Sequence, residues 1–156
     1  MAPWQGEFQN GWLDLVALRY ALKITGEING LALTNLDRLQ NFNEVKVCNN
    51  YEYFGQSSLK TLEKYFDVQT DNHSHNLIIN GLKLTPVDKL KDYVWRQEIT
   101  DILTECHPIY ETLKVNASSF TEDYIQYLEQ KLNVKILITS HGPKARDKKL
   151  VGTLTE

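Results

Sequence analysis

Helical and extended patterns alternate along this chain, and no other feature of the sequence restricts its fold as strongly. Residues 12–25 carry apolar side chains at helical spacing, residues 31–34 form a short apolar run, and residues 44–53 alternate with the period of a strand. Residues 119–132 then predict another helix, and residues 134–139 another short strand. Because helices and strands follow one another in turn, an α/β fold is favoured over a helix bundle.

Capping and turn residues refine this outline. Gly26 predicts the end of the first helix, which we expect to be buried on most sides because few of its residues are charged. A capping box at 119–122 opens the last helix, Thr85-Pro86 open one that runs to about residue 103, and residues 59–66 predict a weaker helix. Asn80-Gly81 lies between two apolar runs and predicts a β-hairpin insertion.

The composition fits a single domain that spans residues 1–156, with residues 1–10 as an N-terminal loop. The chain has 156 residues, 42% of them hydrophobic, and a formal net charge of -3. This charge gives no reason to expect a nucleic-acid partner, and no apolar run approaches the roughly 20 residues of a membrane span. The N-terminus lacks the segments of a signal peptide, so we expect a cytoplasmic protein with no membrane partner.

Several reactive residues have a structural interpretation. Cys48 and Cys106 lack metal-binding spacing and are expected to be buried, reduced thiols, and Cys106 beside His107 is not expected to be a nucleophile. Residues 71–75 contain a His-x-His pair, but no third ligand is near and a solvated loop is favoured. The sequence has no GxxxxGKS/T and no GxGxxG motif, so we expect neither a metal ligand nor a phosphate cradle in this chain.

The first candidate for recognition is Asp37, which follows the strand predicted at 31–34. In open α/β sheets, ligands lie just beyond the carboxyl ends of strands. An ionised carboxylate has two acceptor oxygens and matches the two parallel donors of guanine, N1–H and the exocyclic amine, which adenine cannot offer. The alternative is that Asp37 caps the turn after the strand, and its position alone leaves that alternative open.

A second candidate loop, Ser140-His141-Gly142-Pro143, follows the strand predicted at 134–139. Gly142 would let the backbone come close to a flat ligand, and main-chain groups of the loop could hydrogen-bond the edge of a base. The structural alternative is an ordinary Gly-Pro turn.

Five blocks of sequence, in order, resemble the C-terminal third of adenylosuccinate synthetase. These blocks are 11–21, 30–39, 44–48, 108–113 and 140–143. The resemblance implies the C-terminal part of a mostly parallel sheet flanked by helices. It also implies a GTP-dependent ligase that joins IMP and L-aspartate to form adenylosuccinate in purine (AMP) biosynthesis, with Mg²⁺ as a cofactor of the whole enzyme.

The resemblance also implies roles for individual residues. The segment Asn35, Leu36, Asp37 and the loop Ser140, His141, Gly142 would line the guanine pocket for GTP, with Asn35 at a position where the family has lysine. Guanine selectivity would then depend on Asp37, with weaker affinity because the lysine is missing.

Upstream of residue 11 the chain departs from the family, which carries a Thr-Thr-Gly loop and a run of arginines for the aspartate substrate. Here the matching substrate loop would contain Gln5, Gly6 and Gln9, and residues 2–10 include no arginine. Glutamine cannot supply bidentate carboxylate binding, so either the chain is a divergent branch or it has lost that step. The family's general base, general acid and phosphate loop belong to the N-terminal portion, so no catalytic residue is expected here.

Two hypotheses follow. In the first, the chain is a fragment or subunit that supplies the guanine pocket to an N-terminal portion that binds IMP and L-aspartate; it would be inactive alone and would form a homo-oligomer or a complex with that N-terminal half. In the second, it is a stand-alone, non-catalytic nucleotide-binding or interaction module. An open reading frame just upstream that encodes the missing half would favour the first hypothesis.

Overall fold

The computed structural model describes residues 11–39, 41–115 and 119–152. The N-terminal loop predicted at residues 1–10 lies outside these ranges. Within them, no helix is both long enough and apolar enough to cross a membrane.

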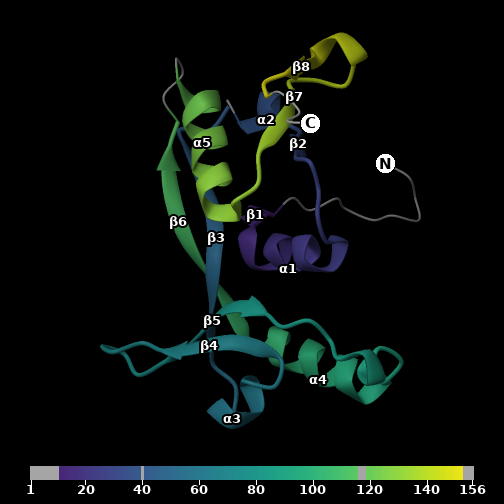
Figure 1. Ribbon diagram of the computed structural model, residues 1–156. Helices are drawn as coiled ribbons and strands as arrows, with labels where there is room; N and C mark the ends of the chain where they lie inside the picture. The colour runs from purple at the N-terminus through teal and green to yellow at the C-terminus, as the bar shows by residue number, and fades with distance from the viewer. Residues whose placement is uncertain (1–10, 40, 116–118, 153–156) are drawn as a thin grey trace, which may run out of the picture.

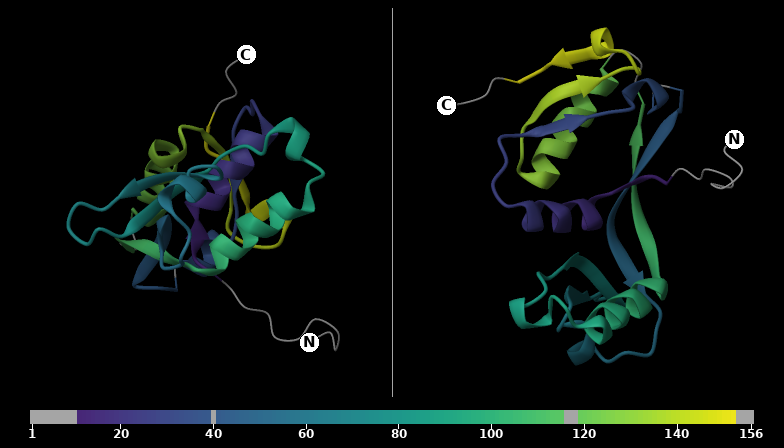
Figure 2. Two further views of the ribbon diagram at one scale, coloured as in Figure 1. Left: turned by 90° about the horizontal axis from the view of Figure 1, so that it is seen from below. Right: turned by 90° about the vertical axis from the view of Figure 1, so that its right-hand side faces the viewer.

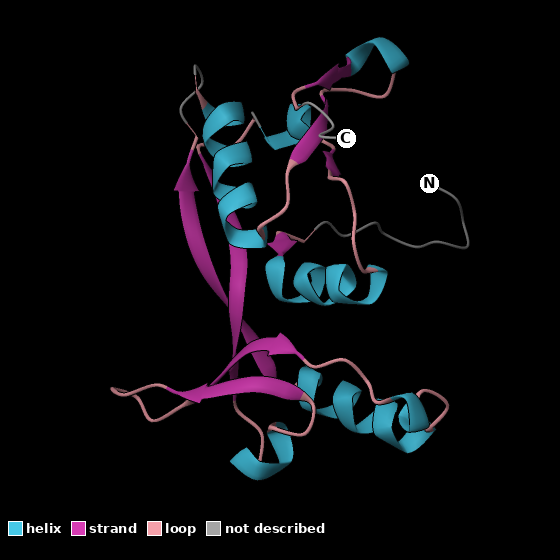
Figure 3. Ribbon diagram, in the orientation of Figure 1, coloured by secondary structure: helices cyan, strands magenta, loops and turns pink. Residues whose placement is uncertain are grey.

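The described chain contains helices and strands in mixed order (Figures 1 and 3). In sequence they are β1 (Leu13–Asp14), α1 (Leu15–Thr25), β2 (Leu31–Leu33), α2 (Leu36–Leu39), β3 (Glu44–Tyr53), α3 (Leu59–Leu62), β4 (Phe66–Thr70), β5 (Leu77–Leu82), the 3-10 helix η1 (Val87–Lys89), α4 (Tyr93–Thr104), β6 (Cys106–Lys114), α5 (Phe120–Leu132), β7 (Ile136–Ser140), the 3-10 helix η2 (Ala145–Asp147) and β8 (Lys148–Leu150).

The strands form two sheets. In the larger, β3 pairs in parallel with β1 and antiparallel with both β6 and β5, and β5 pairs antiparallel with β4. In the smaller, β7 lies between β2, which is parallel to it, and β8, which is antiparallel. The α/β class with helices flanking the sheets is confirmed. The pairing between described strands is mixed rather than mostly parallel, because strands joined by short turns, such as β4 and β5, can pair only antiparallel.

Two hydrophobic clusters contain residues from opposite ends of the long β3–β6 ribbon (Figure 2). We call them the upper and the lower cluster, after the positions of their helices and strands in Figure 1. Val45 and Val47 of β3 belong to the upper cluster together with residues of α5 and β7. Tyr53 at the end of β3 belongs to the lower cluster together with residues of β4, β5 and α4. The ladder between β3 and β6 shifts register near Asn49, between the two clusters. The single-domain assignment of residues 1–156 stays a prediction.

Helix α1 ends at Gly26, as predicted. The Asp14 carboxylate accepts the Ala17 N–H at 3.0 Å and caps the helix start, and Gly26 has a φ of 80°, a backbone conformation that glycine adopts most easily. The expectation that the helix is buried on most sides is wrong for the described chain. Only Leu15 and Val16 are buried, because the main packing partners of α1 are β3 and β5.

The hairpin is not at Asn80-Gly81, which lie inside the continuous strand β5. This strand pairs with β3 through Leu77–Ile79 and with β4 both before and after Asn80, which lies at a register shift of that ladder. The pairing with β4 overrides the local turn preference. The hairpin joins β4 to β5 instead. Its turn is held by Asp71, whose carboxylate accepts the Ser74 N–H at 2.7 Å and the Ser74 hydroxyl at 2.6 Å. The His-x-His segment is therefore the turn of a hairpin.

Two other helix predictions were too long. The helix predicted from Thr85 to about residue 103 is broken into η1 and α4, because the Asp92 carboxylate accepts the Trp95 N–H at 3.1 Å and starts a new helix. The helix predicted at 59–66 ends after one turn, and Phe66, which is fully buried, begins β4. Strands β6 and β8 had no clear pattern in the sequence because most of their side chains are exposed.

Candidate functional site

The two candidate loops leave the same edge of the smaller sheet. Strands β2 and β7 are parallel neighbours, with Leu33 opposite Thr139, so the segments that follow them begin side by side. Helix α2, which carries Asp37, contacts β7 (Figure 1). The fold thus brings together segments that lie about a hundred residues apart in the sequence.

The corner after β2 is shaped by Asn35 and Leu36. Asn35 has a φ of 63°, in the left-handed region that asparagine tolerates better than most residues, and its carbonyl accepts the Arg38 N–H at 3.0 Å. Leu36 is completely buried in the upper cluster. Leu36 therefore anchors the corner, and its side chain is not available to a ligand.

Asp37 lies on α2 with its side chain 38% exposed. Among the described residues, no N–H donates to this carboxylate, and its one ionic neighbour is Arg38, with 3.8 Å between the Arg38 Nε and an Asp37 oxygen. Arg38 is itself largely exposed, so this pair is weak. Within the described chain, the carboxylate is free to accept hydrogen bonds from a ligand, and it does not cap the turn.

The second loop is tightly folded back on itself. The Ser140 hydroxyl donates to the Gly142 carbonyl at 3.1 Å, and Ser140 is only 5% exposed. A Cβ atom at Gly142 would lie 2.6 Å from a carboxylate oxygen of Asp147, so a side chain at this position would displace the Asp147 side chain.

Asp147 and Lys148 organise this loop, and sequence reasoning did not single out either residue for it. The Asp147 carbonyl accepts the His141 N–H at 2.9 Å, and its carboxylate accepts the Lys144 N–H at 2.8 Å. The Lys148 ammonium donates to the Gly142 carbonyl at 2.6 Å. The position of Asp147 at the end of a polar strand-end loop was a weak signal, because its partners are main-chain groups that a sequence does not reveal.

His141 lies on the α5 side of the smaller sheet. One of its ring nitrogens is 3.2 Å from the hydroxyl of Thr139, a fully buried residue two positions earlier. Both residues line an open groove of about 950 Å³ between α5 and β7, together with Glu122 and Glu129 of the helix. Asp37, Ser140 and Gly142 do not line this groove.

The remaining predicted residues, Gln5, Gly6 and Gln9, lie outside the described residues. Within 11–39, 41–115 and 119–152, no three His, Cys, Asp or Glu side chains come together as a metal site. The described residues therefore offer no group of ligands that fits a Mg²⁺ ion.

Both thiols are poor nucleophiles. Both are free, as expected; Cys48 is buried, whereas Cys106 is only half-buried. Burial raises the pKa of each to about 11. The thiolate, which is the reactive form, is therefore scarce at neutral pH.

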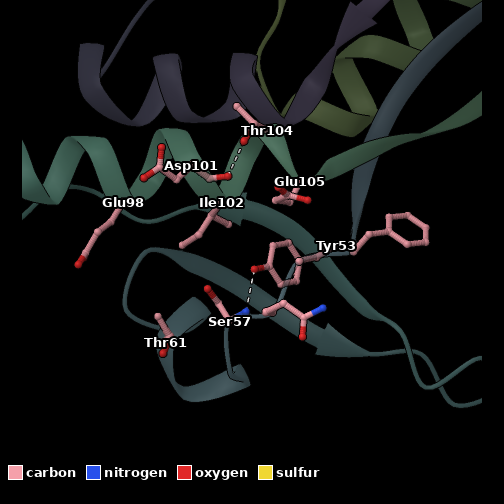
Figure 4. Close-up of a pocket in the computed structure, with 11 residues that line it drawn as sticks. Tyr53, Ser57, Thr61, Glu98, Asp101, Ile102, Thr104 and Glu105 are labelled. Carbon is pink, nitrogen blue, oxygen red and sulfur yellow. Dashed lines mark hydrogen bonds between the residues drawn. The ribbon is translucent and has the colours of Figure 1, made fainter.

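A cavity of about 690 Å³ lies in the lower part of the molecule (Figure 4). Its lining includes the carboxylates Glu98, Asp101 and Glu105 but no lysine or arginine. The Tyr53 hydroxyl accepts the Ser57 N–H at 3.0 Å within it. A cavity with this charge would repel a phosphate group, so it is no candidate for a nucleotide site.

Comparison with known proteins identifies one family. The model of the adenylosuccinate synthetase family matches residues 8–149. The chain is 34% identical over 134 residues to adenylosuccinate synthetase from Chlorobaculum tepidum, and 34% identical over 134 residues to the enzyme from Thermodesulfovibrio yellowstonii. These alignments cover 85% and 86% of this chain but 25% and 26% of the relatives.

A solved structure shares the fold. Fully ligated adenylosuccinate synthetase from Plasmodium falciparum superposes with a TM-score of 0.60 at 21% identity, over 91% of this chain and 29% of that one. The chain therefore spans about a quarter of the length of the curated relatives described above.

Proposed function

Because this chain belongs to the adenylosuccinate synthetase family, we propose that its two candidate loops form the guanine pocket of a GTP-dependent carbon–nitrogen ligase. In this role the Asp37 carboxylate accepts the N1–H and the exocyclic amine of guanine. The observation that carries the proposal is the parallel pairing of β2 with β7, which places the segment with Asp37 beside the loop with Ser140 and Gly142.

The second loop supplies the other side of the pocket through its main chain. The Gly142 carbonyl already accepts the Ser140 hydroxyl and the Lys148 ammonium, whereas no described residue accepts the Gly142 N–H. That N–H suits the O6 acceptor of guanine, which adenine replaces with a donor amine. Asp37 and Gly142 would thus both favour guanine over adenine. The hydrogen bond from the Ser140 hydroxyl to the Gly142 carbonyl would stabilise the loop.

For the whole protein we propose the GTP-dependent joining of IMP and L-aspartate to form adenylosuccinate, in purine biosynthesis in the cytoplasm. This chain would contribute as the C-terminal portion, and we expect it to be inactive alone. A general base, a general acid and a phosphate-binding loop would come from the remaining portion, as would any residues that hold Mg²⁺.

A second candidate function is a stand-alone, non-catalytic nucleotide-binding module. The observation that favours it is the sequence of residues 2–10, which has no arginine to bind the carboxylates of aspartate. In that case guanine binding by Asp37 and Gly142 would remain while the ligase reaction was lost.

Exchange of Asp37 for asparagine tests the guanine pocket. Asp37→Asn keeps the shape of the side chain but replaces one acceptor with a donor that faces a guanine N–H. We expect the affinity for GTP to fall roughly 30- to 1,000-fold, about 2–4 kcal/mol, because one charge-assisted bond is lost and a donor is left unpaired. Titration calorimetry of wild type and variant with GTP, ATP and XTP measures this.

Two controls sharpen the result. XTP carries a carbonyl in place of the amine, so its affinity should rise in Asp37→Asn relative to wild type. Arg38→Gln, which removes the exposed ionic neighbour of Asp37, should leave the preference for GTP over ATP unchanged. Equal GTP affinities of wild type and Asp37→Asn would rule out the assignment of Asp37 as the guanine reader.

A further inference from the structure

Several apolar side chains are exposed on α1 and on the segment from the end of β5 to the start of α4, which together line one groove. We call this set of side chains the α1–α4 face. Its members, with their exposed fractions, are Ile24 (61%), Leu84 (54%), Val87 (86%), Leu90 (48%), Tyr93 (82%) and Val94 (68%). Isolated exposed apolar residues are ordinary, but here three line one groove and the other three belong to the same chain segment, and such a concentration marks an interaction site.

The face also has a concave centre. A groove of about 600 Å³ is lined by Ile24 from α1, Leu84 after β5, and Leu90 just before α4. The groove contains the cationic residues Lys23 and Arg96 but no carboxylate. A partner would therefore present apolar side chains to the groove and acidic groups to its edge.

We propose that the α1–α4 face is the docking surface for the portion of an adenylosuccinate synthetase that this chain does not contain. This inference rests on the proposed function. The relatives are about four times as long as the part that matches, so most of that fold lies outside the chain. A quarter of a globular protein, taken alone, exposes faces that the other three quarters would bury. The face lies within the matched residues 8–149.

A second copy of this chain fits the face less well. In a two-fold dimer the same patch meets itself, so Lys23 and Arg96 of one copy would approach those of the other. The Lys23 ammonium is already paired with the Asp67 carboxylate at 3.4 Å, whereas no carboxylate among the described residues pairs with Arg96. Two Arg96 guanidinium groups brought together would therefore cost free energy.

A chimera tests the proposal with an intact polypeptide. In it, this chain replaces the matching quarter of the Chlorobaculum tepidum enzyme. Hydroxyl-radical footprinting should label Tyr93 and Val94 strongly in the isolated chain and at least about fivefold less in the chimera, because docking removes them from water. Equal labelling of the two proteins, or a chimera that does not unfold as one unit, would overturn the proposal.

Matched substitutions locate the contact. Val87→Glu should lower the melting temperature of the chimera by about 4 °C or more but leave that of the isolated chain unchanged, because Val87 is 86% exposed there. The control is Leu150→Glu, at a position 81% exposed on β8 at the opposite end of the molecule (Figure 2), which should change neither. Equal effects of the two substitutions on the chimera would contradict the assignment.

Two further measurements separate the alternatives. Sedimentation velocity of the isolated chain should show no dimer that Val87→Glu dissociates, since such a dimer would mean that a second copy occupies the face. Failure of the guanine pocket would appear as GTP binding insensitive to Asp37→Asn. If instead the docking surface is wrong, the labelling of Tyr93 and Val94 and the effect of Val87→Glu on the melting temperature will be the same in the isolated chain and in the chimera.

Discussion

At the scale of single residues, the second loop depends on a contact between Gly142 and Asp147. The Asp147 carboxylate lies where a side chain at position 142 would begin, and it also holds the Lys144 N–H. A side chain at position 142 would therefore displace the Asp147 carboxylate from this contact. Asp147 is a positioning residue in the proposed pocket, since it acts through the main chain of the loop.

A double-mutant cycle tests this contact. Gly142→Ala places a methyl group 2.6 Å from the Asp147 carboxylate, which must move and give up its hydrogen bond from the Lys144 N–H, so the affinity for GTP should fall at least about tenfold. Combining it with Asp147→Ala removes the obstruction and should restore part of the binding, so the two effects are not additive. Calorimetric titration of the four proteins measures the coupling. Strictly additive losses would show that Asp147 does not restrict position 142.

At the scale of elements, Glu129 connects helix α5 to strand β7 through a hydrogen bond. One of its carboxylate oxygens accepts the N–H of Ile136, a buried residue, at 2.8 Å, and the other lies 3.1 Å from the Lys135 ammonium. The hydrogen bond from Ile136 is the main reason that the pKa of Glu129 is lowered, with Lys135 adding to it against the opposing effect of burial. Because β7 precedes the second loop, this contact also supports the site.

Removal of this acceptor should destabilise the fold. Glu129→Ala leaves the Ile136 N–H without a partner and should lower the free energy of unfolding by about 1–3 kcal/mol, whereas Glu129→Gln keeps an acceptor and should cost less. Because the folded pKa lies below the unfolded value of about 4.3, the ionic contribution is present above that pH and is lost as pH falls through the folded pKa. Urea unfolding of the three proteins at pH 7 and pH 3 measures both effects, and equal losses in Ala and Gln variants would exclude the hydrogen bond as their cause.

At the scale of the whole molecule, the β3–β6 ribbon connects two hydrophobic clusters. Trp12 packs against the upper cluster and Trp95 against the lower. The ribbon is paired along almost its whole length, from Glu44 opposite Lys114 to Tyr53 opposite Cys106. If one cluster unfolded, one end of the β3–β6 ladder would lose the side-chain packing that supports it, while the other end remained packed.

We expect the two clusters to unfold together. In variants that retain tryptophan only at position 12 or only at position 95, fluorescence should report the same urea midpoint within about 0.3 M, as expected of a two-state domain. Circular dichroism of each variant controls for the effect of the substitutions themselves. Two separated midpoints would divide the chain into two domains and refute the single-domain prediction.

The sequence by itself determined the elements whose signals are local. Helix α1 stops at Gly26, and β3 has its predicted bounds. Helix α5 follows its predicted span and ends at Asn133 in the left-handed conformation, but the predicted capping box is absent, because the Ser119 hydroxyl donates to the Asp123 carboxylate instead of capping the backbone. Each signal acts within a few residues, through a cap, a left-handed residue or a two-residue alternation, and so can be identified without the rest of the fold. The blocks that resemble adenylosuccinate synthetase likewise lie within the residues that the family matches.

Only the tertiary structure decided the features that depend on distant partners. Asn80-Gly81 continues a strand because β4 pairs with β5 before and after Asn80, and β6 becomes a strand by pairing with β3 although its side chains are largely exposed. The contacts of Asp147 with the loop at 141–144 also depend on how the chain folds back. A hydrogen-bonded partner many residues away can outweigh a local preference of about 1 kcal/mol, and no local pattern reveals where that partner will be.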